Sequence, residues 1–222
     1  MKITTSLRRY LGGLDAPEGA LLQQNWRDTD FVVVDLETTG LDARRDHIVS
    51  YGAVPVRDGR IRVGESVYSL VKAPRAVPAE STRIHGIRTQ DLDEAPPLAT
   101  CVETLDELLA NTVVVAHGAW VERTFLRRAF HVSHRTFACP IVDTAQLAMP
   151  FLDVTAESDC LVSLEYAATA LHLPIHTPHH ALGDALTTAN LFIALAGRLE
   201  HERAVTGTPL TTGVLLEPST PQ

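Results

Sequence analysis

Cysteine is scarce in this 222-residue sequence, and its three cysteines, Cys101, Cys139 and Cys160, stand far apart. The absence of a CxxC pair argues against a cysteine-based zinc site and a disulfide framework, so a reducing cytoplasm is the expected compartment. No run of about 18 apolar residues occurs, so no membrane-spanning helix is expected. The N-terminus has basic residues but no apolar stretch after them, and we therefore expect no secretory signal.

Lysine is also scarce, because Lys2 and Lys72 are the only lysines, and the formal net charge is −8. Such a charge argues against a protein that grips nucleic acid by bulk electrostatics. It leaves open a site built on divalent cations, since acidic ligands count as negative in the sequence and are neutralised once the cations bind.

The apolar content of 45% suits a single α/β domain. We expect a helical extension over 1–29, the domain over 30–204, a loop over 74–97 and a flexible tail over 205–222. The apolar patterns predict strands over 31–35, 48–57, 60–71, 112–117 and 140–144, and helices over 99–110, 119–130, 161–173 and 180–203. This order predicts a mixed five-stranded sheet flanked by helices.

Two acids end the first predicted strand. Residues i and i+2 of a strand point to the same face, so Asp35 and Glu37 converge while Leu36 points the opposite way. Two neighbouring carboxylates repel each other and lose hydration, and a bound Mg²⁺ or Mn²⁺ relieves both costs. The alternative is an exposed strand end whose acids face water.

The segment Asp35-Leu-Glu-Thr-Thr-Gly40 resembles the first motif of the DEDDh-type 3′–5′ exonucleases, the family that includes the proofreading (epsilon) subunit of bacterial DNA polymerase III. The resemblance implies that Asp35 and Glu37 are metal ligands. It also implies that Thr38, Thr39 and Gly40 contact the terminal nucleotide next to the metals.

The second motif of that family is a strand followed by His-Asn-Ala-x-Phe-Asp, in which the aspartate binds metal. Here His117 and Ala119 match, Gly118 replaces the asparagine, and Glu122 stands at the aspartate position. Glu122 shares a helical stripe with Phe125, Leu126 and Ala129, which predicts that it faces inward. The alternative is an ordinary glutamate near a helix N-terminus. Compared with the aspartate of the family, a glutamate ligand at position 122 keeps the charge but is longer by one methylene, which displaces its carboxylate oxygens.

The third motif places a histidine five residues before the last aspartate, and His179 and Asp184 have this spacing. Pro178 puts His179 in a loop that enters the final predicted helix. A histidine in such a loop can take a proton from an attacking water near neutral pH. The alternatives are a histidine-rich surface loop or a zinc cluster, for which no convincing ligand spacing exists.

The resemblance covers about residues 30–200 and implies a ribonuclease-H-like fold. Asp35, Glu37, Glu122 and Asp184 would bind two Mg²⁺ or Mn²⁺ ions, His179 would act as general base, and nucleoside 5′-monophosphates would be released. His85, in Ile84-His-Gly-Ile87, and His117 are further candidates for substrate binding. The implied partners are a single-stranded 3′ end and a DNA polymerase or repair protein.

Two alternatives remain at this point. The same site would also serve an exoribonuclease, because the contacts that read the sugar 2′ position are not visible in the sequence. The substitution at Glu122 is also compatible with a weakened domain that binds nucleic-acid ends or a polymerase.

Overall fold

A computed structural model describes residues 19–152 and 162–217 of the chain. The first 18 residues of the expected helical extension lie outside the described residues, as does Cys160. The rest of the extension contains a short helix, α2 (Gly19–Gln23), followed by a 3₁₀ turn, η1 (Trp26–Asp28). None of the described helices has the length and apolar content needed to cross a lipid bilayer.

The strands β1 (Phe31–Thr38), β2 (Ile48–Arg57), β5 (Val113–Ala116) and β6 (Ile141–Asp143) lie in the order β2–β1–β5–β6. β1 is antiparallel to β2 and parallel to β5, and β5 is parallel to β6. β1 therefore lies inside the sheet and is buried on both faces, as its run of β-branched residues predicts.

The fifth position in the sheet is a broken strand. β3 (Arg60–Ile61) and β4 (Val67–Leu70) both pair with β2 and are separated by the 3₁₀ turn η2 (Val63–Glu65). The prediction of one continuous strand over 60–71 is thus wrong, although the mixed sheet with five strand positions is confirmed. An edge strand tolerates such a break because only one of its sides is paired.

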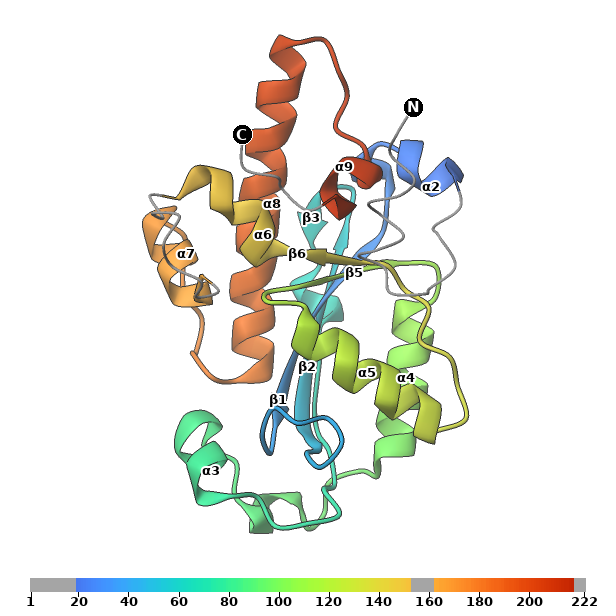
Figure 1. The fold of residues 1–222 in the computed structure, drawn as a ribbon, viewed down its shortest axis with the longest axis vertical. Helices are drawn as coiled ribbons and strands as arrows, with labels where there is room; N and C mark the ends of the chain where they lie inside the picture. The colour runs from blue at the N-terminus through green and yellow to red at the C-terminus, as the bar shows by residue number, and fades with distance from the viewer. Residues whose placement is uncertain (1–18, 153–161, 218–222) are drawn as a thin grey trace.

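Alternation along β1 divides the core between the two faces of the sheet. Phe31 and Val33 pack on one side against α6 (Thr144–Ala148), α7 (Leu164–Ala170) and α8 (Ala181–Val205). Val32, Val34 and Leu36 pack on the other side against α4 (Leu98–Leu109) and α5 (Trp120–Val132). Figure 1 shows the sheet between these two groups of helices. By the same alternation, Asp35 and Glu37 belong to the face covered by α8.

The segment predicted as a loop over 74–97 contains a short helix, α3 (Ala79–His85), and a 3₁₀ turn, η3 (Thr89–Leu92). α3 has no buried residue, so no apolar periodicity reveals it in the sequence. The α7 helix is shorter than the predicted 161–173, and a further 3₁₀ turn, η4 (Met149–Phe151), follows α6.

The prediction of a flexible tail is wrong for residues up to Glu217. The short helix α9 (Thr212–Leu216) packs beside α2, and Leu210, Leu215 and Leu216 are buried. Thr212 is fully buried, and its hydroxyl lies 2.7 Å from that of Thr29 in a hydrogen bond. The two ends of the described chain thus stabilise each other at the end of the sheet opposite α3 (Figure 1).

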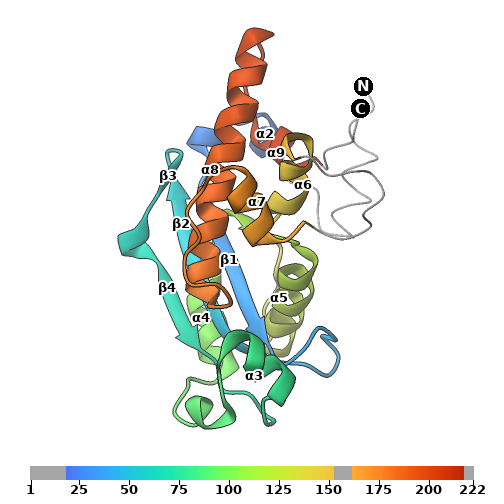
Figure 2. The ribbon, with the colours of Figure 1, turned by 90° about the vertical axis from the view of Figure 1, so that its left-hand side faces the viewer.

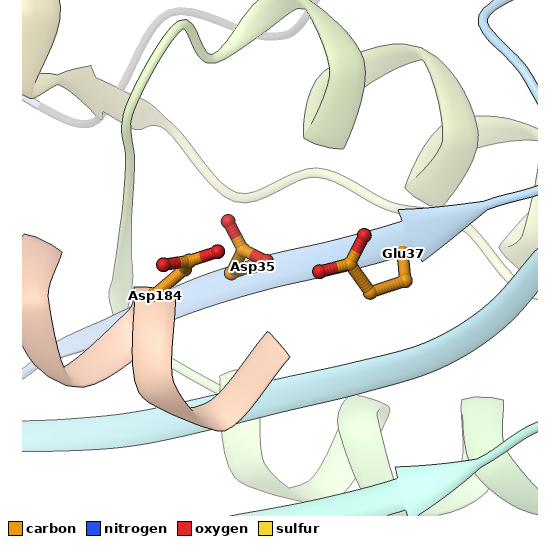
Figure 3. A group of neighbouring side chains, drawn as sticks. All are labelled: Asp35, Glu37 and Asp184. Atoms are coloured by element: carbon orange, nitrogen blue, oxygen red, sulfur yellow. The ribbon is translucent and has the colours of Figure 1, made fainter. Parts of the chain in front are cut away.

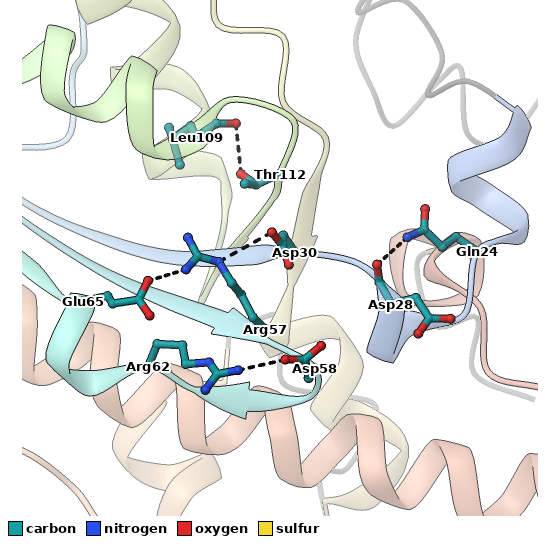
Figure 4. A network of polar contacts seen from close by, with 9 residues as sticks. All are labelled: Gln24, Asp28, Asp30, Arg57, Asp58, Arg62, Glu65, Leu109 and Thr112. Atoms are coloured by element: carbon teal, nitrogen blue, oxygen red, sulfur yellow. Dashed lines mark hydrogen bonds and ion pairs between the residues drawn. The ribbon is translucent and has the colours of Figure 1, made fainter.

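Charged residues surround the start of β1 at that same end (Figure 4). Arg57 makes ion pairs with Asp30, at 3.5 Å, and with Glu65, and Arg62 pairs with Asp58. These groups are largely exposed, so each pair contributes only about 0–1 kcal/mol.

Gly52 allows the first turn of α8 to lie directly on the sheet. A Cβ at this glycine would stand 2.3 Å from the carbonyl oxygen of Ala181. Gly52 pairs with Asp35 on β1, so the close approach brings the start of α8 beside the acids of that strand. Figure 2 shows the N-terminal end of α8 and the helix α3 at the end of the molecule toward which β1 points.

Candidate metal centre

Three carboxylates meet at the end of β1. Asp35 and Glu37 come from the strand and Asp184 from the first turn of α8, and one oxygen from each lies within 4.8 Å of the others. Figure 3 shows the three side chains pointing toward one another. The structure thus joins residues that lie about 150 positions apart in the chain, as the family resemblance implies.

The electrostatics of this cluster oppose ionisation of all its members at once. Burial raises the pKa of Asp35 well above its usual range, and the charges of Glu122, Glu37 and Asp184 raise it further. Burial and the charge of Asp184 raise the pKa of Glu37 to about 7. Burial raises the pKa of Asp184 to about 6, although the backbone N–H of His179 lowers it. Crowded carboxylates of this kind fit a cation-binding set, because a divalent cation lowers the cost of their ionisation.

Glu122 is buried, with 4% of its surface exposed, and the predicted inward stripe on α5 is confirmed. Burial raises its pKa to about 8, and its charge acts on Asp35. Its Oε2 atom has no hydrogen-bond partner. Glu122 is not one of the three carboxylates that lie within mutual reach. An unpartnered buried oxygen beside that group fits a fourth ligand, and it does not fit a glutamate on a solvated helix face.

The turn before α5 is held by a residue to which the sequence assigned no role, Asp143 at the end of β6. Its buried carboxylate accepts hydrogen bonds from the N–H groups of Gly118 (3.0 Å), Ala119 (3.1 Å) and Ala145 (3.0 Å). It therefore caps α6 and fixes the start of α5, which carries Glu122. An aspartate directly before a helix is the local signal for the cap of α6, and it gives no indication of the bonds to Gly118 and Ala119.

Gly118 has a φ of +68°, in the left-handed region. Glycine and asparagine are the residues that adopt this conformation most easily. Gly118 and the asparagine of the family motif are therefore both compatible with this backbone turn.

His117 was predicted to bind substrate, but both of its ring nitrogens have partners within the fold. Nδ1 lies 3.0 Å from the hydroxyl of Thr144, and Nε2 lies 2.7 Å from the carbonyl oxygen of Val162. Burial lowers the pKa of its imidazole. This arrangement favours a structural role for His117 in the turn after β5.

His179 is exposed and has a φ of +57°, a strained conformation for a residue with a side chain. Its backbone N–H donates a 2.8 Å hydrogen bond to Oδ2 of Asp184. The strained loop is therefore fastened to the carboxylate cluster, and it places an exposed imidazole beside Asp184.

The hydroxyl groups of the predicted substrate-binding turn are used within the loop itself. Thr38 donates to the carbonyl oxygen of Gly40 (2.8 Å), and Thr39 donates to Oδ1 of Asp46 (3.1 Å). Thr39 is buried, and a Cβ at Gly40 would stand 2.5 Å from the carboxylate of Asp46. The residues of this turn thus fix its shape, and contact with a nucleotide stays a prediction for all three.

His85 lies at the end of α3, on the same side as the acids. Its Nδ1 accepts a 3.1 Å hydrogen bond from the N–H of Ile87. Burial lowers the pKa of its imidazole, and the charge of His179 contributes to the same shift. Ser81 of α3 also donates a 2.7 Å hydrogen bond to the carbonyl oxygen of Thr39. α3 therefore lies against the turn that follows β1, and substrate contact by His85 stays a prediction.

Solved structures share this architecture. E. coli exonuclease I in complex with a dT13 oligonucleotide superimposes with a TM-score of 0.67 at 16% identity, over 81% of this chain and 44% of that one. Exonuclease X in complex with 5′-overhanging duplex DNA superimposes with a TM-score of 0.61 at 22% identity, over 84% of this chain and 97% of that one. The fold is therefore that of the ribonuclease-H-like exonucleases.

Sequence comparison gives the family. The profile of the RNase T exonuclease family matches residues 32–192, and the chain belongs to this family. A DNA polymerase III subunit epsilon-like protein of Rhodobacter capsulatus is 34% identical over 82% of this chain. A bifunctional exonuclease/endonuclease protein of Mycobacterium tuberculosis, named as putative, is 32% identical over 81%. The chain spans 26% and 28% of the lengths of these two relatives.

Proposed function

We propose that this chain is a 3′–5′ exonuclease that hydrolyses single-stranded 3′ ends, preferably of DNA, to nucleoside 5′-monophosphates. The observation that carries the proposal is the mutual reach of the carboxylates of Asp35, Glu37 and Asp184 at the end of a central strand. Membership of the exonuclease family supports the reaction, and the names of the polymerase III relatives support DNA as substrate. The same names support a DNA polymerase as partner.

The carboxylates of Asp35, Glu37 and Asp184, with Glu122 as fourth member, would hold Mg²⁺ or Mn²⁺. Oxygen ligands of this kind suit both ions. A pair of such ions would stabilise the negative charge that develops on the phosphate during hydrolysis, and would lower the pKa of the attacking water molecule. The residues fit this cofactor because their burial and mutual repulsion are otherwise uncompensated.

The residues of the chain perform the remaining tasks. The imidazole of His179 takes the proton from the water that attacks phosphorus, since it is exposed and fastened beside Asp184 by its own backbone. Asp143 and the start of α8 hold the acids in fixed positions, so the reacting phosphate meets a preorganised site. α3 and the turn over 38–40 border the space for the terminal nucleotide.

Replacing His179 with alanine is expected to lower kcat by roughly 10²-fold, because a positioned general base contributes at least this much. The loss should be smaller at high pH, where hydroxide replaces the base. His172 is a matched control, because it is also exposed and has a φ of +56°. Equal losses in His172→Ala and His179→Ala, measured as initial rates on one oligonucleotide, would refute the assignment.

Replacing Glu122 with aspartate is expected to preserve or raise the activity. The family has aspartate at this position, and the change keeps the charge while it removes one methylene. The reference is Glu122→Gln, which keeps the length of the side chain and removes the charge, and we expect it to be slower by roughly 10²-fold. If Glu122→Asp is as slow as Glu122→Gln, Glu122 is adapted to its own geometry or is not a ligand.

The test of the proposed function is digestion of a 5′-labelled single-stranded DNA and of its RNA counterpart in Mg²⁺, Mn²⁺ or EDTA. A metal-dependent ladder that shortens from the 3′ end, with DNA digested faster, is the expected result. Faster digestion of RNA would make the chain an exoribonuclease with the same site. Binding of the strand by folded protein without digestion in either metal would support a binding module in its place.

A further inference from the structure

An exposed aromatic residue, Tyr68, stands near the acid cluster and is not used by the proposed reaction. It lies on β4 and keeps 38% of its surface exposed. β4 lies at the edge of the sheet and pairs with β2. Its sequence segment was predicted only as part of a strand.

Strand register places Tyr68 on the face that carries the acids. Tyr68 pairs with Gly52 on β2, and Gly52 pairs with Asp35 on β1. Side chains of directly paired residues lie on the same face of a sheet, so Tyr68 and Asp35 project to the same side. Gly52 between them carries no side chain, and the first turn of α8 occupies the space above it. Figure 2 shows β4 beside the N-terminal end of α8.

The ring of Tyr68 has a fixed neighbour on α8. It stacks on the imidazole of His180, with the ring centroids 4.5 Å apart and the planes at 24°. His180 is itself held in place, because it caps α8 through a 3.4 Å contact of its Nδ1 atom with the N–H of Gly183. The charge of Glu37 contributes to raising the pKa of the Tyr68 phenol, after the larger effect of burial, so the phenol lies close to the cluster.

We propose that Tyr68, supported by His180, stacks on the base of a nucleotide that flanks the scissile bond and so holds the strand end over the carboxylates. The inference rests on the proposed function. Aromatic side chains bind unpaired bases by stacking with little sequence preference, and they suit a protein whose net charge of −8 opposes electrostatic binding of nucleic acid. A base stacked at this position must be unpaired, which favours single-stranded ends over blunt duplexes.

The test measures the binding of a short fluorescent single-stranded DNA in Ca²⁺, where hydrolysis is suppressed, and KM and kcat in Mn²⁺. Tyr68→Ala is expected to raise Kd and KM roughly 5- to 100-fold with little change in kcat, because stacking acts on strand binding. Tyr68→Phe keeps the ring and should behave as wild type. His180→Asn removes the imidazole on which Tyr68 stacks but keeps a good helix cap. This variant therefore tests the ring stack without loss of the cap.

A second measurement identifies the base. The oligonucleotide is made with an abasic sugar at its last or its penultimate nucleotide. Wild-type protein should lose affinity for one of these strands, and Tyr68→Ala should show no further loss for that strand. Additive losses at both positions would overturn the proposal.

Other outcomes would also overturn it. A lower kcat and melting temperature in Tyr68→Ala with an unchanged Kd would mean that the tyrosine only supports the cap of α8. Wild-type protein that neither binds DNA in Ca²⁺ nor digests it in Mn²⁺ would contradict the proposed function itself. Normal digestion by wild type with a normal Kd in Tyr68→Ala would contradict the stacking alone.

Discussion

Replacing Asp35 with asparagine is expected to lower the rate of digestion by about 10⁴-fold or more, which is the largest effect of any single change proposed for this chain. Asp35 stands at the centre of the acid cluster, since its carboxylate experiences the charges of Glu122, Glu37 and Asp184. Asparagine keeps the shape of the side chain but cannot supply an anionic ligand. Asp93→Asn is a matched control, because Asp93 is exposed and lies outside the cluster.

The same variant should be more stable than wild type when no metal is present. Burial and three neighbouring charges disfavour the ionised form of Asp35, and asparagine removes that cost. Its melting temperature in EDTA should therefore rise, and the stabilisation by Mn²⁺ should shrink. Such an exchange of stability for activity is common at functional sites. Lower stability in EDTA together with full activity would show that Asp35 serves the fold and not the metal.

The metal-free protein is expected to lose stability as the pH rises from about 5 to about 8. The folded pKa is about 8 for Glu122 and about 7 for Glu37, above the ordinary value of 4.5, and about 6 for Asp184, above 3.8. The folded protein therefore holds protons that the unfolded chain has released. The stability present below pH 4 is lost as the pH rises through these folded values. The titration of Glu122 alone is expected to lower the free energy of unfolding by on the order of 3–5 kcal/mol over this pH range.

Urea unfolding in EDTA across this pH range is the measurement. Glu122→Gln should flatten the profile, because the glutamine does not titrate. Saturating Mn²⁺ should restore stability most at the high-pH end, where the ligands bind as anions. A wild-type profile in EDTA that is flat or rises between pH 6 and 8 would contradict the burial of uncompensated carboxylates.

Much of the site could be predicted from the sequence because its signals are local. The period of two on β1 places Asp35 and Glu37 on one face, and the resemblance to the family's third motif implies that His179 lies beside Asp184. The helical stripe on α5 predicts the burial of Glu122. The inferences on β1 and α5 need only the geometry of a single strand or helix, and the inference on His179 needs only a short motif.

The remainder depends on contacts between distant segments. Two of the three hydrogen bonds of Asp143 join β6 to the turn after β5, and the imidazole of His117 is bound by Thr144 and Val162. No local pattern indicates these partners. Substrate contact predicted for His117 and Thr39 was inferred from motif position, whereas the structure shows both side chains bonded within the fold.

The errors in the fold prediction arise where the apolar pattern of the sequence carries no information on the structure. α3 buries no residue, so its sequence shows no apolar residues at helical spacing that would predict a helix. The tail is rich in threonine and proline, yet α9 is buried because Thr212 meets Thr29, a residue 183 positions away. Apolar periodicity reports which face of an element is buried and gives no information on which distant segment covers it.

The most direct test of the account compares a linear single-stranded DNA with a covalently closed circle of the same sequence in Mn²⁺. We expect nucleoside 5′-monophosphates to be released from the linear strand by wild type, and not by Asp35→Asn, while the circle stays intact because it has no 3′ end. A linear strand left intact by folded protein would contradict the exonuclease assignment. Cleavage of the circle would show an endonuclease at the same carboxylates.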